Sequence, residues 1–416
     1  MAPRPCALRR NNAGVRLGSR TIYYGWVIVA ALSVTETVTW GIIYYGFPVF
    51  LRPMEQDLGA SRVAVTAAFS IGLATSALAS ISVGRWLDRR GPRALMTAGS
   101  CLATLLTFAW ARVHSLPALY IVWFLMGLAM ATTLYEPAFA VLVSWFVRGR
   151  DRALLTVTLA AGLASTIFMP IEAALLERMG WRAALSVLAV VLGVITIPIH
   201  ALLLRQGGAG VSATTADGAP ASGLTLGQAG RTAVFWVLSI AFLVANFATA
   251  AVTTHLIPFL VDRGYSAAFA AATIGWTGAM QLAGRVLFVP ISSRLGARVM
   301  VAAVFVGQAL GIAQLALLSR VGTLLPFIVL QGASNGMATL ARASSLAEIF
   351  GARNYGAIAG AVALGANGAR AVGPVGASLL LLGLGSYPAV FWALAASLVA
   401  ASGAVLLADM QARGQR

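Results

Sequence analysis

Long apolar segments dominate this 416-residue chain and constrain its fold more than any motif does. Each segment reaches the roughly 20 residues that a helix needs to cross the hydrocarbon core of a bilayer. The composition agrees: 59% of the residues are hydrophobic and 10% are charged, whereas soluble domains carry about 25% charged residues. We therefore expect a multi-pass helical membrane protein. The expected spans are 23–51, 63–87, 94–113, 116–146, 153–178, 182–204, 233–261, 267–291, 298–319, 322–346, 355–382 and 386–408.

The basic residues predict how the chain is oriented in the membrane. All 29 are arginine, and against 12 acids they give a net charge of +17, which on a soluble chain would suggest nucleic acid as a partner. Here the arginines fall between the apolar segments, as the positive-inside rule requires. Placing the N-terminus inside puts 19 arginines in cytoplasmic segments and 7 outside, with 3 in or near the membrane. We expect both termini to be cytoplasmic and the protein to lie in the cell (inner) membrane.

A stretch rich in Gly, Ala, Ser and Thr separates the first six spans from the last six. This composition is typical of a flexible linker. The expected organisation is a basic cytoplasmic tail at 1–21, an N-terminal six-helix bundle at 22–205, a cytoplasmic linker at 206–231, a C-terminal six-helix bundle at 232–408 and a cytoplasmic tail at 409–416.

The two halves of the chain are similar in sequence. The segment 88–93 (DRRGPR) aligns with 293–298 (SRLGAR) at an offset of 205, and 59–61 (GAS) aligns with 264–266 (GYS) at the same offset. Such parallel repeats, related by an axis along the membrane normal, describe one large transporter architecture. The predicted fold is an all-α membrane protein with twelve transmembrane helices in two pseudo-symmetric six-helix bundles.

One motif connects the second and third spans. The segment 84–93 (GRWLDRRGPR) resembles the signature loop between helices 2 and 3 of the major facilitator superfamily. A small residue lets helices approach, a carboxylate at a helix end accepts hydrogen bonds, and arginines anchor the loop at an anionic leaflet. The resemblance implies a conformational latch, weaker in the second half, where Ser293 replaces the acid. The predicted latch residues are Gly84, Asp88, Arg89, Gly91 and Arg93.

A narrower resemblance rests on three short pieces. They are 24–26 (YGW), 255–266 (HLIPFLVDRGYS) and Arg285, eight residues before the second copy of the latch. Together they are similar to the monocarboxylate porter and oxalate/formate antiporter branch. This implies secondary transport of a small organic anion, a mono- or dicarboxylate, by proton symport or anion exchange. An exporter of a drug or of a neutral or cationic metabolite is the alternative, although 168–170 (FMP) lacks the Gly-Pro motif usual in multidrug exporters.

Two arginines in the predicted spans are candidate substrate ligands. An ionised side chain near the bilayer centre costs roughly 2.5–3.5 kcal/mol, which is why such residues usually serve a function. Arg285 lies about 12 Å inside the membrane; the resemblance places a carboxylate-binding arginine there, and a guanidinium suits that role through its bidentate fork. Arg370 resembles the second cation, usually lysine, of oxalate/formate exchangers. The alternative role for either is an ion pair with another helix.

Proton coupling is less well defined by the sequence. Gln281 lies one turn before Arg285, where animal monocarboxylate porters carry Asp, so either another group binds the proton or the protein exchanges anions without one. The candidates are Glu36, Glu136 and His255. The alternative role of the acids is a salt bridge to Arg285, Arg370 or Arg342, and that of the histidine is an interfacial position. The remaining predicted substrate contacts are Asn367, Gln281, Tyr45 and Tyr135.

A third arginine in the predicted spans, Arg342, is expected to snorkel or to pair with Glu348 and not to bind substrate.

The sequence gives no sign of an enzyme or a metal site. The three histidines lie far apart, and we find no metal-ligand cluster, nucleotide loop or nucleophile–base spacing. We therefore expect no enzymatic activity, no metal and no cofactor. The expected partners are a small organic anion, protons as a possible coupling ion and the lipid bilayer, with no nucleic acid.

Overall fold

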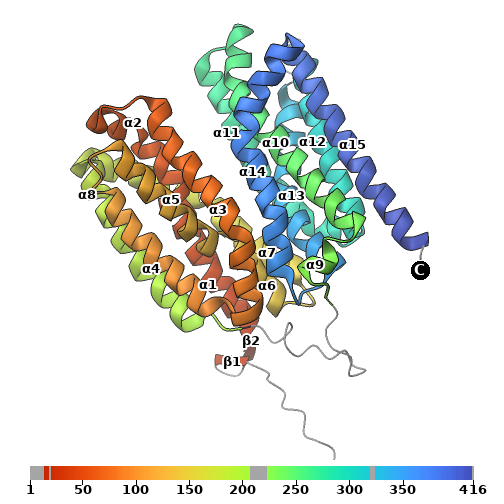
Figure 1. The fold of residues 1–416 in the computed structure, drawn as a ribbon, viewed down its shortest axis with the longest axis horizontal. Helices are drawn as coiled ribbons and strands as arrows, with labels where there is room; N and C mark the ends of the chain where they lie inside the picture. The colour runs from red at the N-terminus through yellow and green to blue at the C-terminus, as the bar shows by residue number, and fades with distance from the viewer. Residues whose placement is uncertain (1–13, 18–19, 207–222, 319–323, 415–416) are drawn as a thin grey trace, which may run out of the picture.

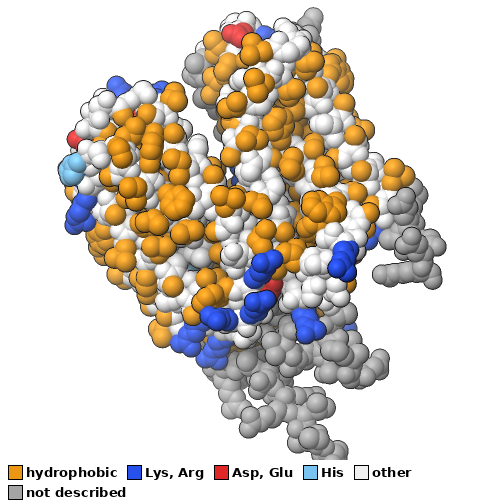
Figure 2. All heavy atoms as spheres, in the orientation of Figure 1, with side chains coloured by type: hydrophobic (Ala, Val, Ile, Leu, Met, Phe, Trp, Pro, Cys, Tyr) orange, Lys and Arg blue, Asp and Glu red, His pale blue; other side chains and the backbone are white. Residues whose placement is uncertain are grey.

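The computed structural model describes residues 14–17, 20–206, 223–318 and 324–414, and its helices form two groups side by side (Figure 1). One group contains the helices up to α8, and the other contains α10 to α15. The groups meet at the end that carries β1, β2 and α9, and they diverge toward the opposite end. We call the end where the groups meet the closed end; at the opposite end the space-filling view shows a cleft between them (Figure 2).

Proline and glycine interrupt the helices of the N-terminal bundle. Pro48 lacks a backbone N–H and crowds the carbonyl of Tyr44, and the preceding turns form the π-helix η1. Leu134 has extended backbone angles before Pro137 and separates α5 from α6. Gly180 has a φ of 75° and, within α8, separates the end of the predicted span 153–178, which begins in α7, from the predicted span 182–204. The bounds are α1 Tyr24–Thr39, η1 Trp40–Tyr45, α2 Gly46–Leu58, α3 Arg62–Arg90, α4 Pro92–Trp110, α5 Leu116–Thr133, α6 Tyr135–Trp145, α7 Arg150–Gly162 and α8 Ala164–Leu203.

The C-terminal bundle has one long helix for each predicted span. Among the residues that the structure describes, eight helical stretches of the whole chain are long and apolar enough to cross a membrane. The other predicted spans are also helical, in α4, α11, α14 and the second part of α8. The fold is the predicted all-α membrane architecture. The bounds are α10 Ala233–Asp262, α11 Ala267–Ser292, α12 Ala297–Ala316, α13 Leu324–Phe350, α14 Tyr355–Leu384 and α15 Tyr387–Gly414.

The sequence repeat extends to the backbone. Gly59 and Gly264, equivalent in the two halves, have φ values of 58° and 87°, a region that glycine enters without a steric penalty. Two residues later, the Ser61 and Ser266 hydroxyls each accept a backbone N–H from the first turn of the next helix, α3 or α11. Both serines are N-caps, so the two halves begin these helices in the same way.

Two short elements lie in segments that the sequence predicts to be a tail and a linker. Strand β1 (Gly14–Leu17) pairs antiparallel with β2 (Arg20–Tyr23). Helix α9 (Leu226–Ala229) begins with a capping box formed by Thr225 and Gln228. The rest of the predicted basic tail (1–13) and the Gly/Ala/Ser/Thr-rich part of the linker (207–222) lie outside the described residues.

At the closed end, α3 of one bundle touches the start of α14 in the other. The Asp88 carboxylate accepts the backbone N–H groups of Gly356 at 2.9 Å and Ala357 at 2.8 Å. These N–H groups lie in the first turn of α14 and have no partner within the helix. Gly91, with a φ of 75°, turns the chain from α3 into α4. The remaining predicted latch side chains, Arg89 and Arg93, are exposed.

A second contact closes the same end on the pseudo-symmetric side. The Asp151 carboxylate, in the first turn of α7, accepts hydrogen bonds from the hydroxyls of Ser292 at 2.9 Å and of Ser344. The sequence predicts a weaker second latch because Ser293 replaces an acid. In the structure an acid is present at this contact, but α7 of the opposite half supplies it.

We predict that Gly84→Val opens the closed end. A Cβ at Gly84 would lie 2.0 Å from the Gly356 carbonyl oxygen, and because that atom belongs to the backbone, the helices must separate. Overpacking of this kind typically costs about 1–3 kcal/mol, so we expect the population of the closed conformation to fall about tenfold. Spin labels at the C-terminal end of α3 and the N-terminal end of α14 should show a longer distance. Gly383→Ala on α14, where a Cβ meets nothing within 4 Å, should leave this distance unchanged; an unchanged distance in Gly84→Val would contradict the prediction.

Candidate binding cavity

A cavity of about 260 Å³ lies between the two bundles. Figure 2 shows the cleft that separates the bundles at the end opposite the closed one. The lining residues come from η1, α3, α5, α6 and α7 on one side and from α10, α11, α13 and α14 on the other, with Leu134 at the α5–α6 break. The cavity brings together seven residues that the sequence singled out: Tyr45, Tyr135, Glu136, Gln281, Arg285, Asn367 and Arg370.

Arg285 reaches across the cavity from α11 to α7. Its Nη1 donates to the backbone carbonyl of Thr158 at 2.6 Å, and its guanidinium also interacts with Tyr135. The side chain is 9% exposed, yet its Nε has no hydrogen-bond partner. Gly162 makes room for it, because a Cβ there would lie 2.5 Å from Nη1. The guanidinium lines the cavity and its hydrogen-bonding capacity is not fully used by the protein, so a small shift of the side chain would let it donate to an acceptor there.

Arg370 is held within its own bundle. Its Nη2 donates to Asn246 Oδ1 at 2.6 Å, and the Asn246 amide nitrogen donates to the Phe242 carbonyl at 2.8 Å, which fixes the orientation of that amide. Asn246 is neutral, so it does not offset the charge. Within the described parts of the chain, no acidic side chain pairs with Arg285 or Arg370. Two positive charges on the cavity wall are therefore uncompensated.

The third arginine of the cavity is paired. Arg342 Nη2 on α13 lies 2.5 Å from Glu136 Oε1 on α6, and this ion pair joins the two bundles. The expectation that Arg342 snorkels or pairs with Glu348 is wrong. Glu348 is close to Arg342 in sequence, but the packing of the two bundles brings Glu136 to it instead. Among the described residues that line the cavity, Glu136 is the only one with an acidic side chain.

The other two proton-coupling candidates do not line the cavity. Glu36 is fully buried in α1, where its Oε2 accepts the indole N–H of Trp40 at 3.0 Å and its Oε1 has no partner. His255 lies in α10, and its Nε2 is 3.2 Å from the Pro374 carbonyl, which can only accept a hydrogen bond. The structure therefore brings Glu136 to the predicted substrate contacts and keeps Glu36 and His255 outside the lining.

The sequence comparison agrees with this architecture. Residues 29–319 match the Major Facilitator Superfamily. The chain belongs to this superfamily. A crystal structure of the superfamily transporter FucP in the outward conformation has the same fold, with a TM-score of 0.71 and 14% identity over 92% of this chain and 99% of that one. The protein is thus a multi-pass membrane protein of this superfamily.

Two curated relatives carry names that match the narrower sequence resemblance. The oxalate:formate antiporter of Oxalobacter formigenes is 27% identical over 62% of this chain. Human monocarboxylate transporter 6 is 30% identical over 39% of it. The aligned region spans 59% and 32% of the lengths of these relatives, respectively.

Proposed function

We propose that this superfamily member transports a small organic anion, a mono- or dicarboxylate. The observation that carries the proposal is the pair of uncompensated guanidinium groups of Arg285 and Arg370 on the cavity wall. A carboxylate in the cavity would offset their positive charge and would accept charge-assisted hydrogen bonds from the guanidinium of Arg285. A cationic substrate would be repelled by the same groups. The names of the antiporter and monocarboxylate relatives support this class of substrate.

The transport cycle we propose is alternating access. Residues 22–205 would rock against residues 232–408 around the cavity. The contacts of Asp88 and Asp151 would break as the closed end opens. The arginine distribution supports cytoplasmic termini and an inner-membrane location, so the closed end would face the cytoplasm.

We further propose that Glu136 decides whether transport is coupled to protons. Glu136 is the acid of the cavity lining in the described chain, and a proton on it would release Arg342. If this happens during transport, the protein is a proton symporter. If Glu136 stays ionised, an anion must return on the arginines, and the protein is an exchanger.

Uptake into proteoliposomes tests the proposal. Labelled formate, lactate, oxalate and succinate would be offered separately, with and without an inward proton gradient, and with and without internal unlabelled substrate. We expect saturable uptake of at least one carboxylate, competed by other carboxylates and not by lactamide, which lacks the charge. Stimulation by the gradient would identify symport, and a requirement for internal anion would identify exchange.

One result would favour the exporter alternative instead. If liposomes took up a cationic or neutral compound and none of the four carboxylates, the anion proposal would be abandoned. The charge on Arg285 and Arg370 disfavours this outcome, because a neutral or cationic compound would leave both guanidinium charges without a counter-charge.

A further inference from the structure

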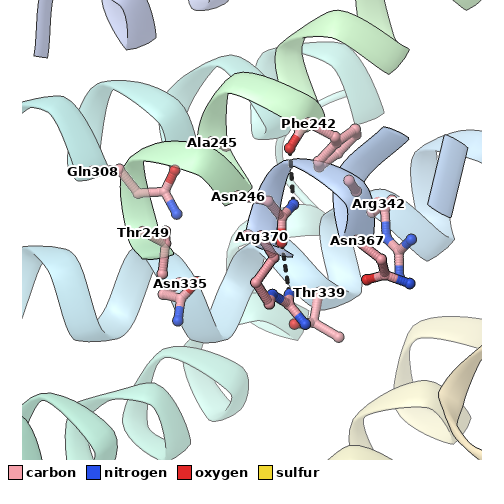
Figure 3. A pocket seen from close by; sticks show the side chains of 12 residues that line it. Phe242, Ala245, Asn246, Thr249, Gln308, Asn335, Thr339, Arg342, Asn367 and Arg370 are labelled. Atoms are coloured by element: carbon pink, nitrogen blue, oxygen red, sulfur yellow. Dashed lines mark hydrogen bonds between the residues drawn. The ribbon is translucent and has the colours of Figure 1, made fainter. Parts of the chain in front are cut away.

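A second pocket, of about 50 Å³, lies within the C-terminal bundle (Figure 3). It is enclosed by α10, α12, α13 and α14. Eight of its twelve lining side chains are polar or charged, which is unusual for the interior of a membrane bundle. It adjoins the main cavity, and six residues line both: Thr249, Asn335, Thr339, Arg342, Asn367 and Arg370.

Gln308 is the residue that sets this pocket apart. It comes from α12, a helix that contributes no described residue to the main cavity. Its side chain is 1% exposed, and its Oε1 has no hydrogen-bond partner. A buried amide without a partner destabilises the folded state. A polar group bound in the pocket would satisfy Gln308 and so would give this residue a function.

The charge of the pocket favours an anion. Arg370 is bound to the neutral Asn246 (Figure 3), whereas Arg342 is already paired with Glu136. A bound carboxylate would meet one uncompensated guanidinium together with the side-chain amides of Gln308, Asn335 and Asn367. The Gln308 amide can turn by 180° to present its NH₂ group to such an anion.

Arg285 is hydrogen-bonded to α7 of the other bundle, and Arg370 to α10 of its own bundle. Arg370 lines both the main cavity and the pocket, whereas Gln308 lines the pocket and Arg285 the main cavity. A ligand that contacts Arg285, Arg370 and Gln308 must therefore extend from the main cavity into the pocket. A water needs a cavity of at least about 10–15 Å³, so the pocket of about 50 Å³ has room for roughly three to five waters or one carboxylate group.

We propose that this pocket is a second subsite, with Gln308 as a specificity-determining residue, and that the preferred substrate is a dicarboxylate longer than oxalate. One carboxylate would bind Arg285, and the other would enter the C-terminal bundle beside Arg370 and Gln308. The inference rests on the proposed function, since it requires that the main cavity takes a carboxylate.

The test compares a dicarboxylate with a monocarboxylate in the same liposomes. Wild-type protein should take up succinate with a higher kcat/KM than oxalate. Gln308→Leu removes the amide at similar size and should lower kcat/KM for succinate about tenfold, the loss expected for one hydrogen bond to a charged group. Uptake of lactate should stay within about twofold, because lactate does not reach the pocket.

Two further variants keep the test decisive. Gln331→Leu is the matched control: Gln331 lies on α13, is 4% exposed and also has an unpaired Oε1, but lines neither cavity. It should not change the succinate-to-lactate ratio. Asn246→Asp places a carboxylate on Arg370 without a change of size, and it should lower the ratio as Gln308→Leu does, even if the latter folds poorly.

The opposing outcomes are distinct. Equal losses for succinate and lactate in both variants, an unchanged ratio in both, or wild-type uptake that favours oxalate over succinate would each overturn the subsite. Failure of the proposed function would look different, because the wild-type protein would then take up no carboxylate at all.

Discussion

Replacing Arg285 with glutamine should lower carboxylate uptake by at least about 100-fold. The side chain is 9% exposed, its Nε–H is unpaired, and no acid among the described residues forms an ion pair with it. A substrate carboxylate would therefore gain a desolvated charge-assisted contact, and truncating one partner of such a pair typically costs about 2–5 kcal/mol. At 1.4 kcal/mol per factor of ten, the lower part of this range already gives the expected loss. The measurement is the initial rate of uptake of the best wild-type substrate, with equal protein in each liposome preparation.

Two variants separate the charge of Arg285 from its position. Arg285→Lys keeps the charge but loses the planar fork and the reach to Thr158, so it should recover a small part of the activity. Gly162→Val keeps the arginine but displaces it, because a Cβ would lie 2.5 Å from Nη1. Gly275→Ala, on the same helix as Arg285 and without neighbours within 4 Å, is the control. Wild-type uptake by the glutamine variant would show that Arg285 does not bind the substrate.

Hydropathy predicted the helices of this protein well, because each helix that spans a bilayer requires about 20 consecutive, mostly apolar residues. The duplication was equally visible: Gly59 and Gly264 share a backbone conformation, and Ser61 and Ser266 cap equivalent helices. Charged residues within the spans were also informative. Arg285, a costly residue at this depth, was singled out from sequence and lies on the cavity wall.

Contacts between helices that are distant in sequence were not predictable in the same way. A salt bridge of Glu136 to Arg285, Arg370 or Arg342 was an alternative from sequence, but no local pattern selects Arg342, which is 206 residues away. The role of Asp151 at the second closing contact could not be predicted for the same reason, because Asp151 and the serines that donate to it belong to opposite halves of the chain. The sequence signal that was available for Gln308 was an amide within an apolar span. Only the packing of α12 shows that this amide lines a pocket.

The ion pair between Glu136 and Arg342 gives the second large effect. Glu136→Gln leaves the Arg342 guanidinium without its partner, in a part of the cavity where both side chains are less than a quarter exposed. Breaking one partner of a buried pair typically costs about 3–5 kcal/mol. We expect uptake to fall about 100-fold in Glu136→Gln and in Arg342→Gln. Initial uptake rates of the best wild-type substrate, measured as for Arg285, check this.

Exchanging the two charges shows whether the pair acts as a tie between the bundles or through its separate members. Glu136→Arg combined with Arg342→Glu restores an ion pair between α6 and α13, and we expect it to recover uptake to within about tenfold of wild type. The pair need not keep its polarity to join the bundles, because the attraction is symmetric. If the double variant takes up substrate no faster than either single variant, Glu136 or Arg342 has a function that requires the native sign of charge at its position. A proton gradient then distinguishes the two residues: a gradient response lost in Glu136→Gln and kept in Arg342→Gln would place the coupling proton on Glu136.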